Sequence, residues 1–354
     1  MTRFLRMLSP VLWVSVIGWS AMVHGATPMP SQPYSLCIGR FVIDLPVGAN
    51  ARIDASYHFI EPQKPKQVDS FEQVKQQLEV RAKDLQTHQI QRSPRHDAMA
   101  KAGGFDPDKL YGKTQLLGFD IDDSLQQVVL GYMPDPTSSG IISEVHKIFN
   151  NMDYVFKFED AGADNYAKDR QILWAAATSF TPLNNRTPPT KPGFCVDGGM
   201  FADSGKPPVK ESFTLVVRFA DHPDAQFVID AHAIDAVNKD EPSLRHRVDG
   251  ELNILRANVQ GHVGVIDRGD LKAAGQDGYQ IGISAPYDEV PGTHIRKFFW
   301  SADGVPNDVT RPFMEVDMTI QPTDDGKSTI KTDAEAKALW DQLIGSLRIR
   351  PGAV

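Results

Sequence analysis

Two segments of the sequence have residue types that could perform chemistry, one as a nucleophile and one as a phosphate site. Ser284 follows Gly282 as in the Gly-x-Ser-x-Gly turn of hydrolases, but Pro286 replaces the second glycine. Residues 112–114 (GKT) match the end of a phosphate-binding loop, but Pro107 stands where that loop needs its first glycine. Proline has no backbone N–H to donate to a phosphate, so the second segment predicts no phosphate site. The first segment lacks a required glycine of the turn, so it predicts no nucleophile.

The candidate metal-binding motifs are also incomplete. Residues 120–131 begin like a calcium loop, but Leu125 replaces the glycine of the sharp turn and Gly131 replaces the bidentate glutamate. His222 and His232 flank a predicted hairpin, and Asp230 and His232 could form a ligand pair on one face of the sheet, although that motif is common by chance. Paired carboxylates fall at predicted turns, where solvation explains them. We therefore assign no catalytic residue, no metal ligand and no cofactor, and predict that the protein is not an enzyme.

The charge of the chain limits its partners. The sequence has 354 residues, with 37 Lys and Arg against 45 Asp and Glu, for a net charge of −8. A nucleic-acid binder would carry a basic stripe or patch. We therefore exclude nucleic acid as a partner and expect no electrostatic docking onto anionic lipid.

The N-terminus predicts export. Arg3 and Arg6 precede an apolar run at residues 7–23, and the chain then becomes polar and Pro-rich. This is the layout of a secretory signal peptide, with cleavage expected near residues 25–27. Pro10 and several small polar residues interrupt the run, so it is a poor membrane-spanning helix and we expect no stable membrane insertion.

The two cysteines, Cys37 and Cys195, are the only pair that could form a disulfide. Export places the chain in an oxidising compartment, where such bonds persist. We expect the bond, and the alternative is two buried free thiols.

Local patterns in the first half predict strands and helices in turn. Period-two alternation and β-branched residues indicate strands, and apolar residues at three- and four-residue steps after Ser70 indicate a helix. We expect strands at residues 37–45, 51–60, 114–121, 125–133 and 143–158, helices at 70–85 and 164–180, and a loop at 88–104.

A Pro-rich segment divides the chain near its middle. Residues 181–193 hold four prolines and no apolar period, which predicts an extended linker. We therefore expect a signal peptide at 1–25, an N-terminal α+β domain at 26–180 and a C-terminal α+β domain at 194–354.

The order of elements then repeats. We expect strands at residues 194–201, 212–219, 225–233, 262–271, 278–285, 293–301 and 313–320, and helices at 244–258 and 333–347. Each half starts with a cysteine beside strand residues and ends with a helix that carries a tryptophan, Trp174 or Trp340, so duplication is a hypothesis. The predicted fold is α+β: two similar lobes, each an antiparallel sheet packed with helices, joined by the Pro-rich linker.

Two lobes on a linker suit the recognition of a partner, and interfaces concentrate exposed aromatic side chains. Four aromatic residues fall in predicted loops and are our candidates for partner binding: Phe105, Tyr111, Phe201 and Tyr287. For each of them the alternative is ordinary packing beneath a loop.

Two motifs carry a family resemblance. Residues 37–46 (CIGRFVIDLP) and 193–199 (GFCVDGG) resemble the Tli family, fourth class, of periplasmic immunity proteins against type VI secretion lipases. The resemblance implies a periplasmic two-domain α+β protein that clamps a phospholipase of α/β-hydrolase fold with its lid closed. It carries over no catalytic or contact residues, and the loops at 88–113 and 286–311 are where the particular effector would be distinguished.

Two other functions stay open from the residues themselves. The chain could be a periplasmic envelope or solute-binding module, or an exported hydrolase whose site follows no common motif. A lipase gene beside this one would favour the immunity protein, and turnover of an ester would favour the hydrolase.

Overall fold

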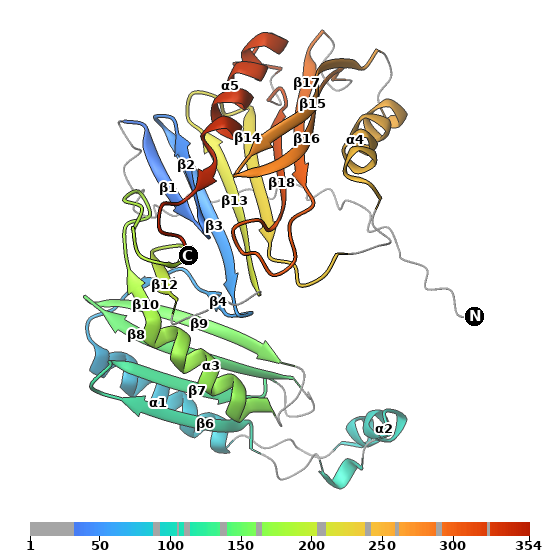
Figure 1. The fold of residues 1–354 in the computed structure, drawn as a ribbon. Helices are drawn as coiled ribbons and strands as arrows, with labels where there is room; N and C mark the ends of the chain where they lie inside the picture. Colours follow the sequence, from blue (N-terminus) through green and yellow to red (C-terminus); the bar gives the residue numbers. More distant parts are fainter. Residues whose placement is uncertain are drawn as a thin grey trace.

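The computed structural model describes residues 32–354 except 88–92, 105, 110–113, 135–139, 161–164, 204–209, 238–241, 259–261, 288–291 and 324–325. It contains antiparallel sheets of seven and six strands, two small three-stranded sheets and flanking helices. In Figure 1 the lobe with α4 and α5 lies above the lobe with α1 and α3, and β10 and β12 lie between them. The predicted α+β architecture is confirmed. The predicted signal peptide, residues 1–25, lies outside the described residues.

The upper lobe is built on the seven-stranded sheet, in the order β15-β16-β17-β18-β14-β13-β3. β3 pairs with β13 along its whole length, from Ala49 opposite Phe219 to Tyr57 opposite Glu211. A strand from the region expected to form the N-terminal domain is therefore an edge strand of the sheet formed by the C-terminal half. The strands are β3 (Ala49–Tyr57), β13 (Glu211–Phe219), β14 (Ala225–His232), β15 (Gly264–Ala273), β16 (Gln276–Pro286), β17 (His294–Ala302) and β18 (Phe313–Ile320).

Two helices cover opposite faces of this sheet, α4 (Leu244–Asn258) and α5 (Asp333–Ser346). On α5 the Trp340 ring packs 6.2 Å from Phe227 and 5.5 Å from Phe298. On the other face, α4 places Val248 in a cluster with Phe299. Successive strand residues point to opposite faces, so the neighbours Phe298 and Phe299 contact different helices.

The lower lobe is built on the six-stranded sheet, in the order β4-β9-β8-β7-β6 with β5 also paired to β9. The same alternation along β7 directs Val128 toward Leu78 of α1 and Val129 toward Leu173 of α3. The elements are β4 (Glu61–Pro62), β5 (Lys66–Gln67), α1 (Phe71–Thr87), β6 (Leu116–Asp122), β7 (Gln127–Tyr132), β8 (Ile141–Phe149), β9 (Met152–Asp160) and α3 (Tyr166–Ser179).

Two small sheets connect the lobes. One contains β1 (Tyr34–Ile38), β2 (Phe41–Leu45) and β19 (Arg348–Ile349), and the other contains β10 (Phe180–Pro182), β11 (Gly193–Val196) and β12 (Gly199–Ala202). The single strand expected at 37–45 is a hairpin instead, because Gly39 turns the chain with φ +55°. One buried apolar cluster includes Val129 of the lower sheet and Phe227 of the upper sheet, so the lobes share a continuous core.

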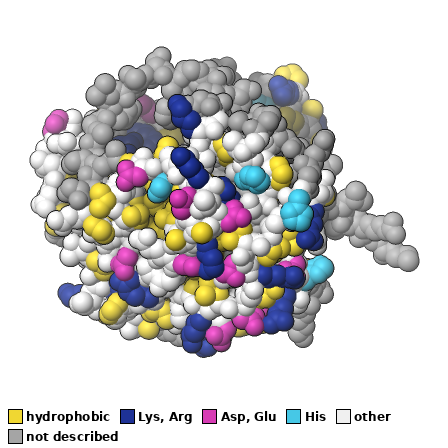
Figure 2. Space-filling view, turned by 90° about the horizontal axis from the view of Figure 1, so that it is seen from above, with side chains coloured by type: hydrophobic (Ala, Val, Ile, Leu, Met, Phe, Trp, Pro, Cys, Tyr) yellow, Lys and Arg dark blue, Asp and Glu magenta, His cyan; other side chains and the backbone are white. Residues whose placement is uncertain are grey.

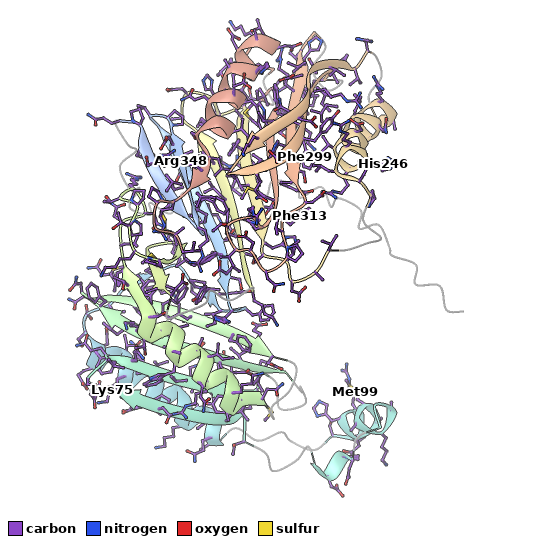
Figure 3. All side chains as sticks on the ribbon, in the orientation of Figure 1. Lys75, Met99, His246, Phe299, Phe313 and Arg348 are labelled. Carbon is purple, nitrogen blue, oxygen red and sulfur yellow. A yellow bond between two sulfur atoms is a disulfide. The ribbon has the colours of Figure 1, made fainter. Side chains whose placement is uncertain are left out.

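The loop expected at 88–104 contains a helix, α2 (Pro94–Ala102), followed by a 3₁₀ turn, η1 (Pro107–Lys109). The Ser93 side chain accepts a hydrogen bond from His96 N, and Pro94 occupies the first helical position. Proline is well tolerated there, so the Ser-Pro pair begins a helix rather than preventing one. α2 projects away from the sheets and carries the exposed Met99 (Figures 1 and 3).

Across the described part of the chain, no helix combines the length and the apolar character needed to cross a membrane.

Candidate partner-binding site

The tight turn between β3 and β4 lies where the two lobes meet (Figure 1). Tyr57 and Ile60 exchange backbone hydrogen bonds of 3.0 and 2.9 Å, and His58 and Phe59 between them have φ of +57° and +65°. Positive φ at both central residues defines a type I′ turn, which normally takes Asn or Gly. An L-residue in this region costs roughly 1–2 kcal/mol, and a bulky one such as phenylalanine is an outlier.

Two other hairpins show what this turn normally contains. Asn150 and Asn151 join β8 to β9 with φ of +49° and +58°, and Ala274 and Gly275 join β15 to β16 with φ of +54° and +76°. Each of those turns contains a residue that adopts positive φ easily. The His58–Phe59 turn contains neither Asn nor Gly, and the Phe59 side chain is 56% exposed.

Two cavities, of about 890 and 560 Å³, adjoin this turn and share Ser56 and Glu61. Both are lined by residues of the two large sheets, so they form one inter-lobe groove. The larger is lined by Ser56, His58, Phe59, Glu61, Lys157, Phe158, Glu159, Asp160, Lys168, Asp169, Ile172 and Lys210, and the smaller by residues of β3, β13 and β14 with the β4 segment.

Charges of both signs surround the turn. The Lys210 ammonium lies 4.5 Å from the centre of the Phe59 ring, and the His58 N–H donates to Lys210 O at 2.8 Å. Burial, and secondly the Lys210 charge, lower the pKa of His58, which favours its neutral form. Burial and the neighbouring Asp160 carboxylate raise the pKa of Asp169. The groove therefore offers both basic and acidic groups around one exposed ring.

The upper face of the molecule carries mixed charges. Figure 2 shows Lys and Arg side chains interspersed with Asp and Glu on this face. Among the described residues visible there, no large region carries charges of one sign alone.

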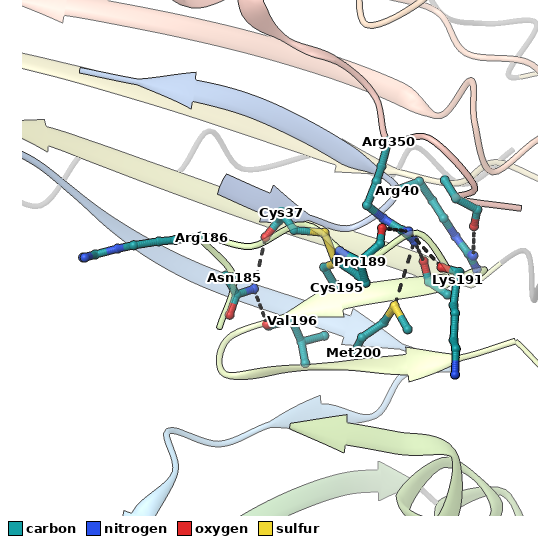
Figure 4. The surroundings of a disulfide bond; sticks show 12 residues. Cys37, Arg40, Asn185, Arg186, Pro189, Lys191, Cys195, Val196, Met200 and Arg350 are labelled. Atoms are coloured by element: carbon teal, nitrogen blue, oxygen red, sulfur yellow. Dashed lines mark hydrogen bonds between the residues drawn. A yellow bond between two sulfur atoms is a disulfide. The ribbon is translucent and has the colours of Figure 1, made fainter. Parts of the chain in front are cut away.

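The Cys37–Cys195 disulfide joins the two small sheets that connect the lobes. The predicted bond is present, with Cα atoms 5.9 Å apart. The Asn185 amide donates to Cys37 O at 3.1 Å and to Val196 O at 2.8 Å, so the middle segment is tied to both small sheets (Figure 4). Both cysteines are fully buried.

A buried ion cluster lies beside the disulfide. The Arg40 guanidinium donates hydrogen bonds to the carboxylates of Asp203 and Glu211. Nη2 lies 2.9 Å from Asp203 Oδ1, and Nε lies 3.0 Å from Glu211 Oε2. Arg350 donates to the carbonyls of Pro189 and Gly193. The two arginines thus connect the first hairpin, the middle segment and the C-terminus, and they hold the lobes in one arrangement.

The structure places only some of the predicted contact residues. Tyr287 is half-buried after β16, and its hydroxyl accepts a hydrogen bond from Gln321 Nε2 at 2.8 Å. Phe105 and Tyr111 lie outside the described residues.

The expectation that Phe201 is exposed in a loop is wrong. It lies in β12 with no exposed surface, and its ring stacks 4.8 Å from Tyr57. Gly199 lies in the same strand, and its missing Cβ leaves room for the Phe180 ring, which packs against Phe201. Phe201 therefore cannot contact a partner.

The residues considered for chemistry remain apart. Ser284 is buried within β16. His222 Nδ1 lies 2.9 Å from the Thr329 hydroxyl, whereas His232 stacks on Phe313, with ring centres 4.9 Å apart. Phe313 lies in the upper lobe (Figure 3). Among the residues that the structure describes, no group of three or more His, Cys, Asp or Glu could hold a metal ion.

The sequence did not reveal Phe59, because residues 51–60 look like one strand. His58 and Phe59 stand between strand residues with no Gly, Asn, Asp or Pro to indicate a turn. The only local signal is His58, a residue type enriched at positive φ.

Comparison with solved structures finds the same architecture in other proteins. The apo immunity protein TplEi of the type VI secretion system from Pseudomonas aeruginosa matches with 20% identity and a TM-score of 0.71, over 90% of this chain and 97% of that chain. A chain of the Tle4–Tli4 complex matches with 21% identity and a TM-score of 0.71, over 91% of this chain and 98% of that chain. At these identities the similarity is one of fold. No curated protein matches the sequence.

The chain therefore shares the two-lobed α+β fold of these structures. Residues 187–352 match the family model described as Tle cognate immunity protein 4 C-terminal domain. This match, over slightly less than half of the chain, agrees with the resemblance to the Tli family that the two motifs carry.

Proposed function

We propose that this protein is an immunity protein that binds and inhibits a cognate type VI secretion lipase effector. The observation that carries the proposal is the family match over residues 187–352. The shared fold with TplEi and with a chain of the Tle4–Tli4 complex, over about nine-tenths of this chain, supports it. Inhibition by binding requires no catalytic group in the inhibitor, so we propose a non-enzymatic, stoichiometric mode of action.

The proposed mechanism uses the fixed arrangement of the two lobes. A lipase of α/β-hydrolase fold that acts on a membrane must move its lid to expose an apolar cleft. A rigid two-lobed protein that binds only the closed form shifts that equilibrium by its differential affinity for the two forms. Holding a half-open lipase 99% closed requires about a 100-fold preference, or roughly 2.7 kcal/mol.

The proposed location is the periplasm, after removal of the signal peptide near residues 25–27. The Cys37–Cys195 disulfide supports this proposal, because such bonds persist in oxidising compartments. Protection from a lipase that attacks the membrane from the periplasmic side also requires the inhibitor to be there.

A titration of the mature chain, residues 26–354, against the lipase encoded beside its gene tests the proposal. We expect nanomolar binding and complete loss of lipase activity at one equivalent. An unrelated lipase serves as the control and should keep its activity. A folded sample that neither binds nor inhibits the cognate lipase contradicts the proposal.

The closed-lid mechanism has its own test. A covalent phosphonate in the lipase active site holds the lid open, and binding to this adduct should be at least 100-fold weaker than to free lipase. Equal affinity for the two forms would show that inhibition does not depend on the lid.

One observation favours a second candidate, a solute-binding module. The cavity of about 890 Å³ lies within the range of small-molecule pockets. Binding of a small ligand in the absence of any lipase, with no inhibition, would favour this function.

A further inference from the structure

We propose that Phe59 is an anchor residue that inserts into an apolar pocket on the partner lipase. This inference rests on the proposed function and identifies where the inter-lobe groove is recognised. It follows from three separate properties of Phe59: its exposure, its backbone conformation and its neighbours.

Exposure separates Phe59 from other aromatic residues. In the described parts of the chain, the large exposed hydrophobic residues include two aromatics, Phe59 at 56% and Phe149 at 45%. Phe59 lines the larger inter-lobe cavity. Phe149 pairs with Met152 at the start of β9, whereas Glu61, two residues after Phe59, pairs with Lys157. At about 3.3 Å per strand residue, the offset of five residues between these positions spans roughly 17 Å, so the two rings lie well apart along the sheet.

The backbone of Phe59 is held in a conformation that its side chain opposes. The same type of turn between β8 and β9 uses two asparagines, which adopt positive φ readily. An exposed ring adds little to folding, so its burial within this molecule does not offset the backbone cost. Strained residues cluster at binding sites, where a partner supplies the compensating interactions.

The neighbours of Phe59 fix the direction of the ring. The turn is tied to the segment before β13 through the hydrogen bond from His58 N to Lys210 O, and the Lys210 ammonium lies over the ring. A ring ordered before binding loses little conformational freedom in a complex. Aromatic residues that fill a pocket at the centre of an interface dominate binding energies. The matching pocket on the lipase is apolar, with a carboxylate or carbonyl oxygen at its rim for Lys210.

The test measures the affinity for the cognate lipase and the melting temperature of the same variants. Phe59→Asn and Phe59→Gly remove the ring but leave residues suited to positive φ. We expect each to melt at the same or a higher temperature than the wild type and to bind the lipase at least 30-fold more weakly. The control, Phe149→Asn, removes an exposed phenylalanine elsewhere and should change the affinity less than twofold.

The outcomes distinguish the inference from the proposed function. Wild-type inhibition with unchanged affinity in both Phe59 variants overturns the anchor and leaves the immunity function standing. Lower melting temperatures in both variants overturn the anchor as well, because they would make Phe59 a structural residue. A wild-type protein that does not bind the lipase overturns both.

Discussion

Arg40 has almost no exposed surface and lies between two carboxylates that are also buried, Asp203 and Glu211. Burial raises the pKa of Glu211 to about 7, although the Arg40 guanidinium lowers it. The Ala353 carbonyl accepts a further hydrogen bond from Arg40 at 2.8 Å. Removal of the arginine would leave two acidic groups in a site that water does not reach.

Replacement of this arginine should therefore be severe. Arg40→Ala should lower the free energy of unfolding by about 3–5 kcal/mol, because breaking a buried ion pair leaves an uncompensated charge. The matched control is Arg52→Ala, since Arg52 pairs with Asp54 in the open, with both side chains more than half exposed. It should change stability by less than about 0.5 kcal/mol. Equal effects of the two variants in urea unfolding would contradict the structural role of Arg40.

His146 predicts how stability depends on pH. Burial alone would lower its pKa, but the hydrogen bond to Asp153 and the Glu144 carboxylate, 3.6 Å from Nε2, raise it to about 9. A histidine with a raised pKa stabilises the fold fully below its unfolded pKa of about 6.5 and loses that contribution as the pH rises through 9.

We expect urea unfolding of the wild type to show a loss of up to about 3 kcal/mol between pH 6.5 and 9.5. His146→Gln should be less stable at pH 6.5 and should lose much less over the same range. A wild type and a variant with the same pH profile would rule out the charged His146.

The first hairpin and the two small sheets form a junction that depends on contacts distant in sequence. Cys37 in β1 is joined to Cys195 in β11, 158 residues away, and the backbone of Gly39 exchanges hydrogen bonds with that of Cys195. β3 follows this hairpin directly and enters the upper sheet, whereas β4 enters the lower one. The disulfide therefore fixes the segment from which both lobes take a strand.

The double variant Cys37→Ala, Cys195→Ala should lose about 2–5 kcal/mol of unfolding free energy, because the bond restricts a long loop in the unfolded chain. Reduction of the wild type should produce a loss of similar size, and the reductant should not affect the variant. A variant as stable as the oxidised wild type would show that the ion cluster and core suffice at this junction.

At the scale of the molecule, the shared core makes the two lobes one rigid body with a groove between them. The apolar cluster that contains Val129 and Phe227 runs through the junction, so the lobes cannot separate without exposing apolar surface. A preformed groove suits a partner that must be held in one conformation.

Protection should depend on delivery as well as on shape. A chain that lacks residues 2–25 should fold in the cytoplasm and fail to protect cells from the cognate lipase directed to the periplasm, because inhibitor and lipase never meet. An unrelated export signal placed before residue 26 should restore survival. Full protection by the cytoplasmic chain would contradict the periplasmic site of action.

The local elements were determined by the sequence itself. The period of apolar residues located α1, α5 and most strands of both sheets, because this signal depends on neighbours a few positions apart. The single strand expected at 143–158 is wrong, because Asn150 and Asn151 turn the chain there and divide it into β8 and β9. The chain has only two cysteines, so the inference of export was enough to predict which disulfide forms. The resemblance of the two cysteine segments to the Tli family was visible for the same reason, because both motifs are short and continuous in sequence.

Only the tertiary structure decided how these elements combine. β3 pairs with β13, Phe201 is buried beneath Tyr57, and Phe59 turns outward at the junction. Each result depends on residues more than a hundred positions apart, or on a backbone conformation that the side chains themselves disfavour. Local propensity holds no information on such contacts, because the free energy that selects them comes from the packing of the whole core.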